Sequence, residues 1–229
     1  MKSQHKLALS AGLLAMVAPV FAGADIIVAS HDLVIRRGPT KESSTSGANL
    51  HAKASTNNST DRVVLLRFDS ANFGANTSAA TFLFNANPDT VTQFQGTFNY
   101  RVWGVNDGDP QDEVFTEAGY NPGDANTVYD GSANLIDTTQ LTNLGDVNSI
   151  SAGDNFNFSS AALTSFIQAD TNGTVALLIE RLSLGGNSTF YSRENQTAPP
   201  RLDITVVPEP YSLALLGLGG LLIARRRRA

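Results

Sequence analysis

The 229-residue sequence contains no cysteine, one tryptophan and three histidines, and each shortage removes a class of chemistry. Without cysteine the chain cannot use a thiol as a nucleophile. It also cannot form disulfides, so its stability has to come from a buried core. His5 lies near the start, which leaves His31 and His51 as the imidazoles of the body. Since the sequence also has no Gly-x-Ser-x-Gly, His-Glu-x-x-His or phosphate-loop motif, we expect no enzymatic activity.

Basic residues are also few in the central part of the chain. Of the 16 Lys and Arg residues, two lie in residues 1–24 and four in residues 208–229, which leaves ten between them. The same central part, residues 25–207, holds 20 of the 21 acidic residues, for a net charge of about −10. Such a surface repels phosphate backbones, so we expect no nucleic-acid partner. The segment is long enough for one domain with its own core.

The first 24 residues have the three parts of a signal peptide. Lys2 and Lys6 form a positive start, residues 7–18 are apolar, and Ala22 and Ala24 supply the small residues of a cleavage site. We predict cleavage before Asp25. An uncleaved membrane anchor is the alternative, but the apolar stretch is short for that role.

The final 22 residues contain the other long uncharged run of the chain. Residues 211–224 carry no charge and, as a helix rising about 1.5 Å per residue, would reach roughly 21 Å, less than the ~30 Å hydrocarbon core. Flanking arginines that snorkel and local membrane thinning would close part of the gap. The positive-inside rule keeps the arginines cytoplasmic and places the body outside, in agreement with the signal peptide.

Three features stand in order in this tail: a Pro-Glu-Pro triplet, an apolar run and an arginine cluster. Prolines hold the chain extended, which suits recognition by a processing enzyme. The tail resembles the PEP-CTERM sorting signal of Gram-negative bacteria, which implies recognition and cleavage by an exosortase, a membrane protease. A C-terminal anchor that is never cut is the alternative. The residues that carry the resemblance are Pro208, Glu209, Pro210, Arg225, Arg226, Arg227 and Arg228.

Short apolar runs separated by Gly, Asn and Pro predict a strand-rich body. Some runs alternate between apolar and polar residues, and others are continuously apolar, as in buried strands. This spacing indicates an all-β fold, a jelly-roll-like β-sandwich. The predicted strands cover residues 25–35, 49–54, 63–69, 80–85, 97–105, 174–183, 189–193 and 201–207.

A single segment has the apolar spacing of a helix. Leu163, Phe166 and Ile167 fall at positions i, i+3 and i+4, and Ser159 or Ser160 is a suitable N-cap. We therefore expect one short helix packed against the sandwich.

The composition of two stretches predicts loops. Residues 38–60 are polar and predict a surface loop that holds the short strand near residues 49–54. Residues 106–154 are rich in acidic and turn residues, and we expect a long irregular stretch of the kind that often carries function.

Several body segments resemble the DNRLRE domain family of secreted β-sandwich proteins. The resemblance implies a jelly-roll-like sandwich and association with polysaccharide. The family's tryptophan-containing middle strand has no counterpart in residues 112–131, so ligand contacts made there are not carried over. The matching segments are residues 65–69, 79–84, 97–105, 158–167, 175–179, 190–195 and 200–202.

Four charged residues within or beside strands, Arg67, Asp69, Arg193 and Glu194, are candidates for ion pairs that fix strand register. Direct contact with a ligand is the alternative role, and we favour the structural one.

The acidic run that follows residue 105 is a candidate calcium site. Asp107, Asp109, Asp112 and Glu113 offer several carboxylate oxygens at close spacing, although not at the spacing of an EF-hand. A solvated acidic turn is the alternative interpretation.

Aromatic residues are candidates for stacking on sugar rings. Trp103 lies in a predicted strand, where core packing is its alternative role, whereas Tyr120 and Tyr129 lie in the predicted irregular stretch.

Taken together, the sequence predicts an exported, exosortase-sorted and non-catalytic protein of the cell envelope or extracellular matrix, anchored transiently in the inner membrane. Its expected partner beyond the exosortase is extracellular polysaccharide. Two alternatives remain: a structural surface protein that binds other proteins, and a polysaccharide lyase or hydrolase that uses a pair of carboxylates.

Overall fold

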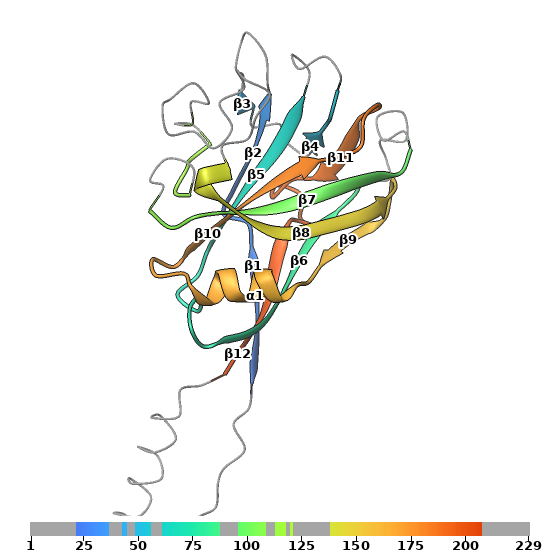
Figure 1. Ribbon diagram of the computed structural model, residues 1–229. Coiled ribbons are helices and arrows are strands. Elements are labelled where there is room, and N and C mark those ends of the chain that lie inside the picture. The colour runs from blue at the N-terminus through green and yellow to red at the C-terminus, as the bar shows by residue number, and fades with distance from the viewer. Residues whose placement is uncertain are drawn as a thin grey trace, which may run out of the picture. The chain divides into compact units, whose positions relative to one another are not determined.

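The computed structural model describes residues 22–36, 43–44, 49–55, 61–87, 96–108, 113–117, 120 and 138–207. All of them fall within one structural unit, Ala22–Val207 (Figure 1). Residues 1–21 of the predicted signal peptide, which covers residues 1–24, and the predicted sorting tail, residues 208–229, lie outside the described residues. The helices within the described ranges are too short or too polar to cross a membrane.

The described residues are mostly β-structure, as predicted, with one short α-helix. The helix is α1 (Ala161–Gln168), and a 3₁₀ turn, η3, spans Thr138–Gln140. The strands are β1 (Gly23–Val28), β2 (His31–Arg36), β3 (Ser43–Ser44), β4 (Asn49–Ala52), β5 (Arg62–Asp69), β6 (Thr77–Asn85), β7 (Phe98–Val105), β8 (Leu141–Ile150), β9 (Asn155–Phe158), β10 (Thr174–Arg181), β11 (Ser188–Tyr191) and β12 (Arg201–Val206).

The strands form three antiparallel sheets. One has four strands in the order β1-β12-β6-β9, and a second has six strands in the order β3-β2-β5-β10-β7-β8. The third is the pair β11-β4. The segment predicted as one strand over residues 25–35 is two strands that belong to different sheets. Ala29 and Ser30 connect the two strands. Ala29 N donates to Pro200 O beside the four-stranded sheet, and Ser30 N donates to Arg67 O in the six-stranded sheet, so each connecting residue is hydrogen-bonded to a different sheet.

The prediction of an irregular stretch over residues 106–154 is wrong for its last part, because β8 lies there and pairs with β7. In β8 the buried residues are Leu141, Leu144 and Ile150, spaced too widely for the alternating pattern of a strand. Register shifts in the pairing with β7 allow this spacing.

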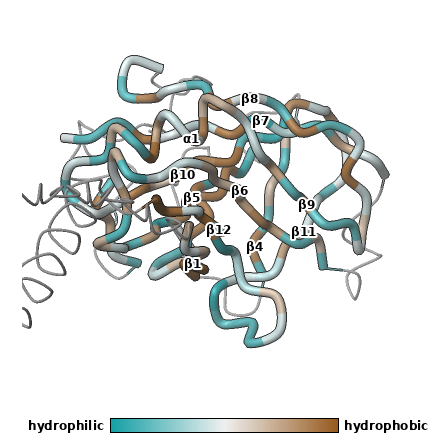
Figure 2. Tube along the Cα trace, turned by 90° about the horizontal axis from the view of Figure 1, so that it is seen from below, coloured by the Kyte–Doolittle hydropathy of each residue, from teal (hydrophilic) through white to brown (hydrophobic). Residues whose placement is uncertain are grey.

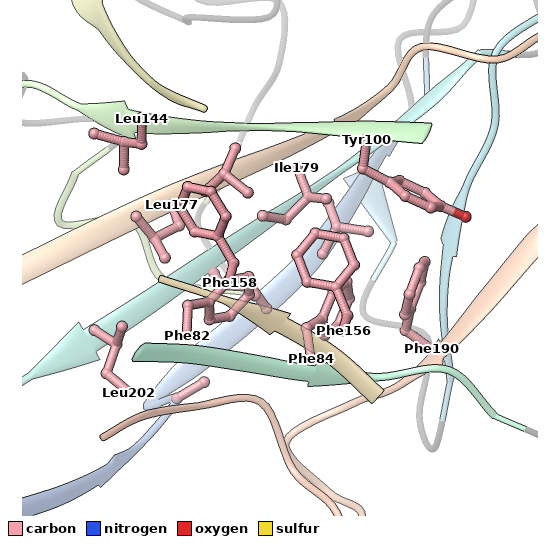
Figure 3. Close-up of a cluster of buried hydrophobic side chains, with 14 of the residues drawn as sticks. Phe82, Phe84, Tyr100, Leu144, Phe156, Phe158, Leu177, Ile179, Phe190 and Leu202 are labelled. Carbon is pink, nitrogen blue, oxygen red and sulfur yellow. The ribbon is translucent and has the colours of Figure 1, made fainter. Parts of the chain in front are cut away.

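Residues from the four-stranded and six-stranded sheets share the main core. Figure 3 shows Phe82 and Phe84 of β6 and Phe156 of β9 pointing toward Ile179 of β10. The rings pack edge to face or stacked, with the Phe84 and Phe190 centroids 4.2 Å apart. Each buried side chain of this size contributes about 1.5–3 kcal/mol, so a chain without disulfides is held by this aromatic core.

The other face of the six-stranded sheet is also covered. Alternate residues such as Leu65 and Leu178 point away from the main core into a second cluster that includes Phe115 and Tyr120. Both faces of β5 and β10 are therefore buried, which explains why these strands are continuously apolar in sequence. Figure 2 shows apolar residues concentrated along these central strands.

Helix α1 begins where the sequence predicts. The Ser160 hydroxyl accepts a hydrogen bond from Leu163 N at 2.9 Å and caps the first turn. Leu163 and Ile167 are buried against the core, and the Phe166 ring lies over Gly104 of β7. A Cβ at Gly104 would come within 2.5 Å of that ring, so a glycine is required for the helix to approach the sheet.

Candidate functional site

Three carboxylates from separate segments meet at one end of the six-stranded sheet, and we call them the acidic cluster: Asp107, Glu113 and Asp170. Asp107 follows β7, Glu113 begins the described segment 113–117, and Asp170 follows α1. One oxygen of each side chain lies within 4.8 Å of the others. The turn after the helix thus brings a third acid to the two that are close in sequence.

Backbone and hydroxyl donors satisfy only part of the acidic cluster. The Oδ2 atom of Asp107 accepts from the backbone N and the hydroxyl of Thr171, at 3.0 and 2.9 Å. Asp170 Oδ2 accepts from Gly173 N at 2.9 Å, and Glu113 Oε2 accepts from Gly108 N at 3.3 Å. Two buried oxygens, Glu113 Oε1 and Asp170 Oδ1, have no hydrogen-bond partner among the described residues.

Burial makes ionisation of the acidic cluster costly. Glu113 is 2% exposed, and burial raises its pKa to about 7; a hydrogen bond from the Asn172 side chain opposes the increase, and the nearby Asp107 carboxylate adds to it. Burial and the Asp107 charge likewise raise the pKa of Asp170. The two buried acids of the cluster therefore resist ionisation unless a positive charge lies close to them.

A second group brings together residues of β2, of the segment 113–117 and of the turn after β11, and we call it the arginine cluster: Asp32, Glu117, Arg193 and Glu194. Arg193 Nε lies 2.5 Å from Glu117 Oε1 and 3.1 Å from Glu194 Oε1, and Arg193 Nη2 donates to Glu117 Oε2 at 3.2 Å. Asp32 Oδ2 accepts from Arg193 N at 2.6 Å. The guanidinium supplies the cation of this cluster.

The pKa values in the arginine cluster differ between its acids. Burial raises the pKa of Asp32, which is 1% exposed, to about 7, and the Glu194 and Glu117 charges add to the increase. Burial also acts on Glu117, but hydrogen bonds from Arg193 and from Asp32 N outweigh it and lower the pKa. The predicted structural role of Arg193 and Glu194 agrees with this pairing. Arg67 and Asp69 also pair, with Nε and Oδ1 2.9 Å apart.

The aromatic candidates fall in the core or outside the described residues. Trp103 is 9% exposed, packs in the second cluster, and donates from Nε1 to Glu180 Oε2 at 2.9 Å. Tyr120 is also buried there, with its ring 6.0 Å from that of Phe115. Little of either ring is left for stacking on a sugar. Tyr129 lies outside the described residues.

The four carboxylates predicted as metal ligands fall partly within and partly outside the described residues. The structure brings Asp107 and Glu113 together, whereas Asp109 and Asp112 lie outside the described residues. Sequence reasoning missed Asp170. The signal available was its place in the turn after a predicted helix, followed by Asn172 and Gly173, but nothing in the sequence says which loop that turn meets.

The ends of the described unit lie side by side. Gly23 of β1 pairs with Val206 of β12, and Val207 N donates to Asn76 O at 2.9 Å. The fold is therefore hydrogen-bonded up to the residue before Pro208. The β1 strand also starts two residues before the predicted cleavage position at Asp25.

Comparison with known proteins identifies the segment that follows. No curated protein sequence matches the chain. Residues 206–228 match the family model of the PEP-CTERM protein-sorting motif. The predicted sorting signal is confirmed, and the motif implies an exported, cell-surface sorted protein that is processed by an exosortase.

Proposed function

We propose that this chain is a non-catalytic surface or matrix protein whose β-rich body associates with extracellular polysaccharide after exosortase processing. The observation that carries the proposal is the junction at Val207. The PEP-CTERM match begins at residue 206, inside β12, and no spacer separates the hydrogen-bonded fold from the sorting motif. The cargo delivered by the sorting signal is therefore the β-rich unit itself.

The finer fold assignment, a jelly-roll-like sandwich of the DNRLRE type, is part of the same proposal. Support comes from the placement of two of the segments that carry the resemblance, residues 65–69 and 190–195. The Leu-Arg-Phe-Asp run lies in β5, and Ser192 to Asn195 follow β11 directly. In both, the arginine pairs with a neighbouring acid, which fits a structural use of these segments.

The surface chemistry that supports polysaccharide association is hydrogen bonding, because Trp103 and Tyr120 are buried. Strand β8 forms an edge of the six-stranded sheet and presents a row of polar side chains. Its Ser149 has φ 63°, a strained value for a residue other than glycine, and Asn99 Oδ1 accepts from its backbone N. The exposed polar residues of this strand are Thr142, Asn143, Asp146, Asn148 and Ser149.

Intact mass of the exported protein tests the processing. We expect a chain that has lost both its signal peptide and the arginines 225–228, with the second cut near residues 208–210. Replacing Pro208, Glu209 and Pro210 by alanine should leave the tail attached. Glu194→Ala, which removes an exposed glutamate of the β-rich unit instead, should be processed normally. A mature protein that retains Arg228 would contradict the proposal.

Retention of the purified exported protein on immobilised acidic and neutral polysaccharides tests the association. We expect Asn148→Ala to weaken retention roughly two- to tenfold, as the loss of one hydrogen bond does. Asn157→Ala, an exposed asparagine on β9 in the other sheet, is the matched control. No retention of the unmodified protein on any polymer would favour the structural alternative with protein partners. Turnover of a polymer would favour a lyase or hydrolase.

A further inference from the structure

We infer that Asp107, Glu113 and Asp170 bind one calcium ion, which joins the end of β7, the segment 113–117 and the turn after α1. This site differs from the one predicted from sequence, because its third ligand comes from a turn that is distant along the chain. The inference is independent of polysaccharide association.

The first argument is the state of the buried oxygens. Glu113 is 2% exposed and Asp170 is 9% exposed, yet one oxygen of each lacks a hydrogen-bond partner among the described residues. A buried carboxylate oxygen without a donor is costly. Because both residues contribute to a group with oxygens within 4.8 Å of each other, one cation between them would satisfy both.

The second argument is the contrast with the arginine cluster. There, Arg193 lies within 3.1 Å of Glu117 and Glu194 and supplies the positive charge. None of the ion pairs formed among the described residues involves Asp107, Glu113 or Asp170. Within the described part of the chain, the acidic cluster thus has three carboxylates and no side-chain cation that corresponds to Arg193.

The donor set selects calcium over other common metals. All three ligands are carboxylates, and the group includes no histidine or cysteine, which zinc and copper prefer. Calcium accepts six to eight oxygens in irregular geometry, so bidentate carboxylates and water at the exposed Asp107 can complete the shell. Magnesium requires a near-ideal octahedron, which three loop residues do not impose. Extracellular calcium modules commonly have a Kd of about 0.1–1 mM, and we expect that range here.

Calcium at this position would stabilise the cover of the second core. Glu113 is two residues before Phe115, whose ring packs in the second cluster with Tyr120. Asp107 is already joined to Thr171 by two hydrogen bonds. The ion would therefore attach segment 113–117 to two turns that the sheet and helix already hold in place.

The test is calcium titration of the exported protein after treatment with EDTA, by calorimetry and by thermal unfolding. We expect one site per chain and an increase in Tm of about 5 °C at 10 mM calcium. Glu113→Gln keeps the shape of the side chain and should abolish both the heat of binding and the Tm shift. Asp170→Asn should weaken binding at least tenfold and serves as a second, independent variant.

Glu194→Gln is the matched control, because it removes an acid from the cluster that Arg193 neutralises. This variant should bind calcium like the unmodified protein. The inference would be overturned if the unmodified protein showed no heat and no Tm shift, or if Glu113→Gln and Asp170→Asn both kept the full response. An equal response to magnesium would overturn the assignment of calcium.

Discussion

The acidic cluster and the arginine cluster each bring three carboxylates together, and they differ in what balances the charge. In the arginine cluster the partner is part of the chain: Arg193 bonds to Glu117 and Glu194, and its backbone N–H bonds to Asp32. In the acidic cluster the donors are all neutral, namely backbone N–H groups, the Thr171 hydroxyl and the Asn172 side-chain amide, and Glu113 Oε1 and Asp170 Oδ1 have no hydrogen-bond partner among the described residues. In the arginine cluster the folded chain itself supplies the cation that balances the carboxylates, whereas in the acidic cluster a balancing cation would have to come from solution.

The largest expected effect concerns Asp32, the most deeply buried acid of the arginine cluster. Its pKa is about 7 in the folded protein, against an ordinary value of 3.8. A carboxyl group whose pKa is raised by folding favours the folded state fully below pH 3.8, and this contribution is lost as the pH rises to about 7. Asp32→Asn should remove that loss, which amounts to about 4 kcal/mol.

Urea unfolding of both proteins at pH 4, 5.5 and 8 measures the effect. The stability of Asp32→Asn relative to the unmodified protein should increase across this series. The asparagine oxygen can still accept from Arg193 N, so the geometry is conserved. A constant difference between pH 4 and pH 8 would show that Asp32 is ionised throughout, with Arg193 compensating its burial.

The second prediction removes the cation of the arginine cluster. Arg193→Met leaves Glu117 without its two side-chain donors and should lower the free energy of unfolding at pH 7 by about 2–4 kcal/mol. Arg193→Lys keeps the charge but cannot donate two parallel bonds, so its loss should be smaller. Adding Glu117→Gln to Arg193→Met should recover part of the stability, which a double-mutant cycle in urea measures. Full additivity would mean that the two side chains do not interact.

The same comparison shows how far sequence reasoning reaches. Arg193 and Glu194 are two of the four charges within or beside strands that the sequence indicates as candidates for ion pairs, and the structure pairs them with each other. The stronger partner, Glu117, lies in the stretch predicted to be irregular, and Asp32 begins an apolar run in which a buried acid gives no signal. In the acidic cluster, Asp107 and Glu113 are close in sequence, but Asp170 joins them only through the packing of α1.

The same distinction applies to the strands: some could be predicted from their own sequence, and others could not. Strands such as β5 and β10 were predicted because continuous apolar runs record burial on both faces. Strand β8 was missed because register shifts against β7 and the positive φ values of Gly145 and Ser149 interrupt the two-residue period. In both shifts the extra residue lies on β8, and Gly145 is the one residue of this strand whose type could have indicated such a bulge.

A third prediction concerns the acidic cluster without metal. In EDTA at pH 8, Glu113→Gln should raise the free energy of unfolding by about 1–2 kcal/mol, because it removes a charge that burial and Asp107 both disfavour. Removing an acid should thus stabilise the acidic cluster, whereas removing Arg193 destabilises the arginine cluster. Chemical unfolding in EDTA provides the measurement, and a loss of stability in Glu113→Gln would indicate that the chain itself supplies a partner for this carboxylate.

The smallest expected effect is that of Glu194→Gln, at the rim of the arginine cluster. The side chains of Glu194 and Arg193 are 42% and 36% exposed, and Arg193 keeps its bonds to Glu117 when Glu194 is neutral. An ion pair this exposed contributes about 0–1 kcal/mol, so unfolding in urea should change by less than about 0.5 kcal/mol. A larger loss would mean that Arg193 needs both acids to hold its position, and that the cluster acts as one unit rather than as a buried pair with an exposed neighbour.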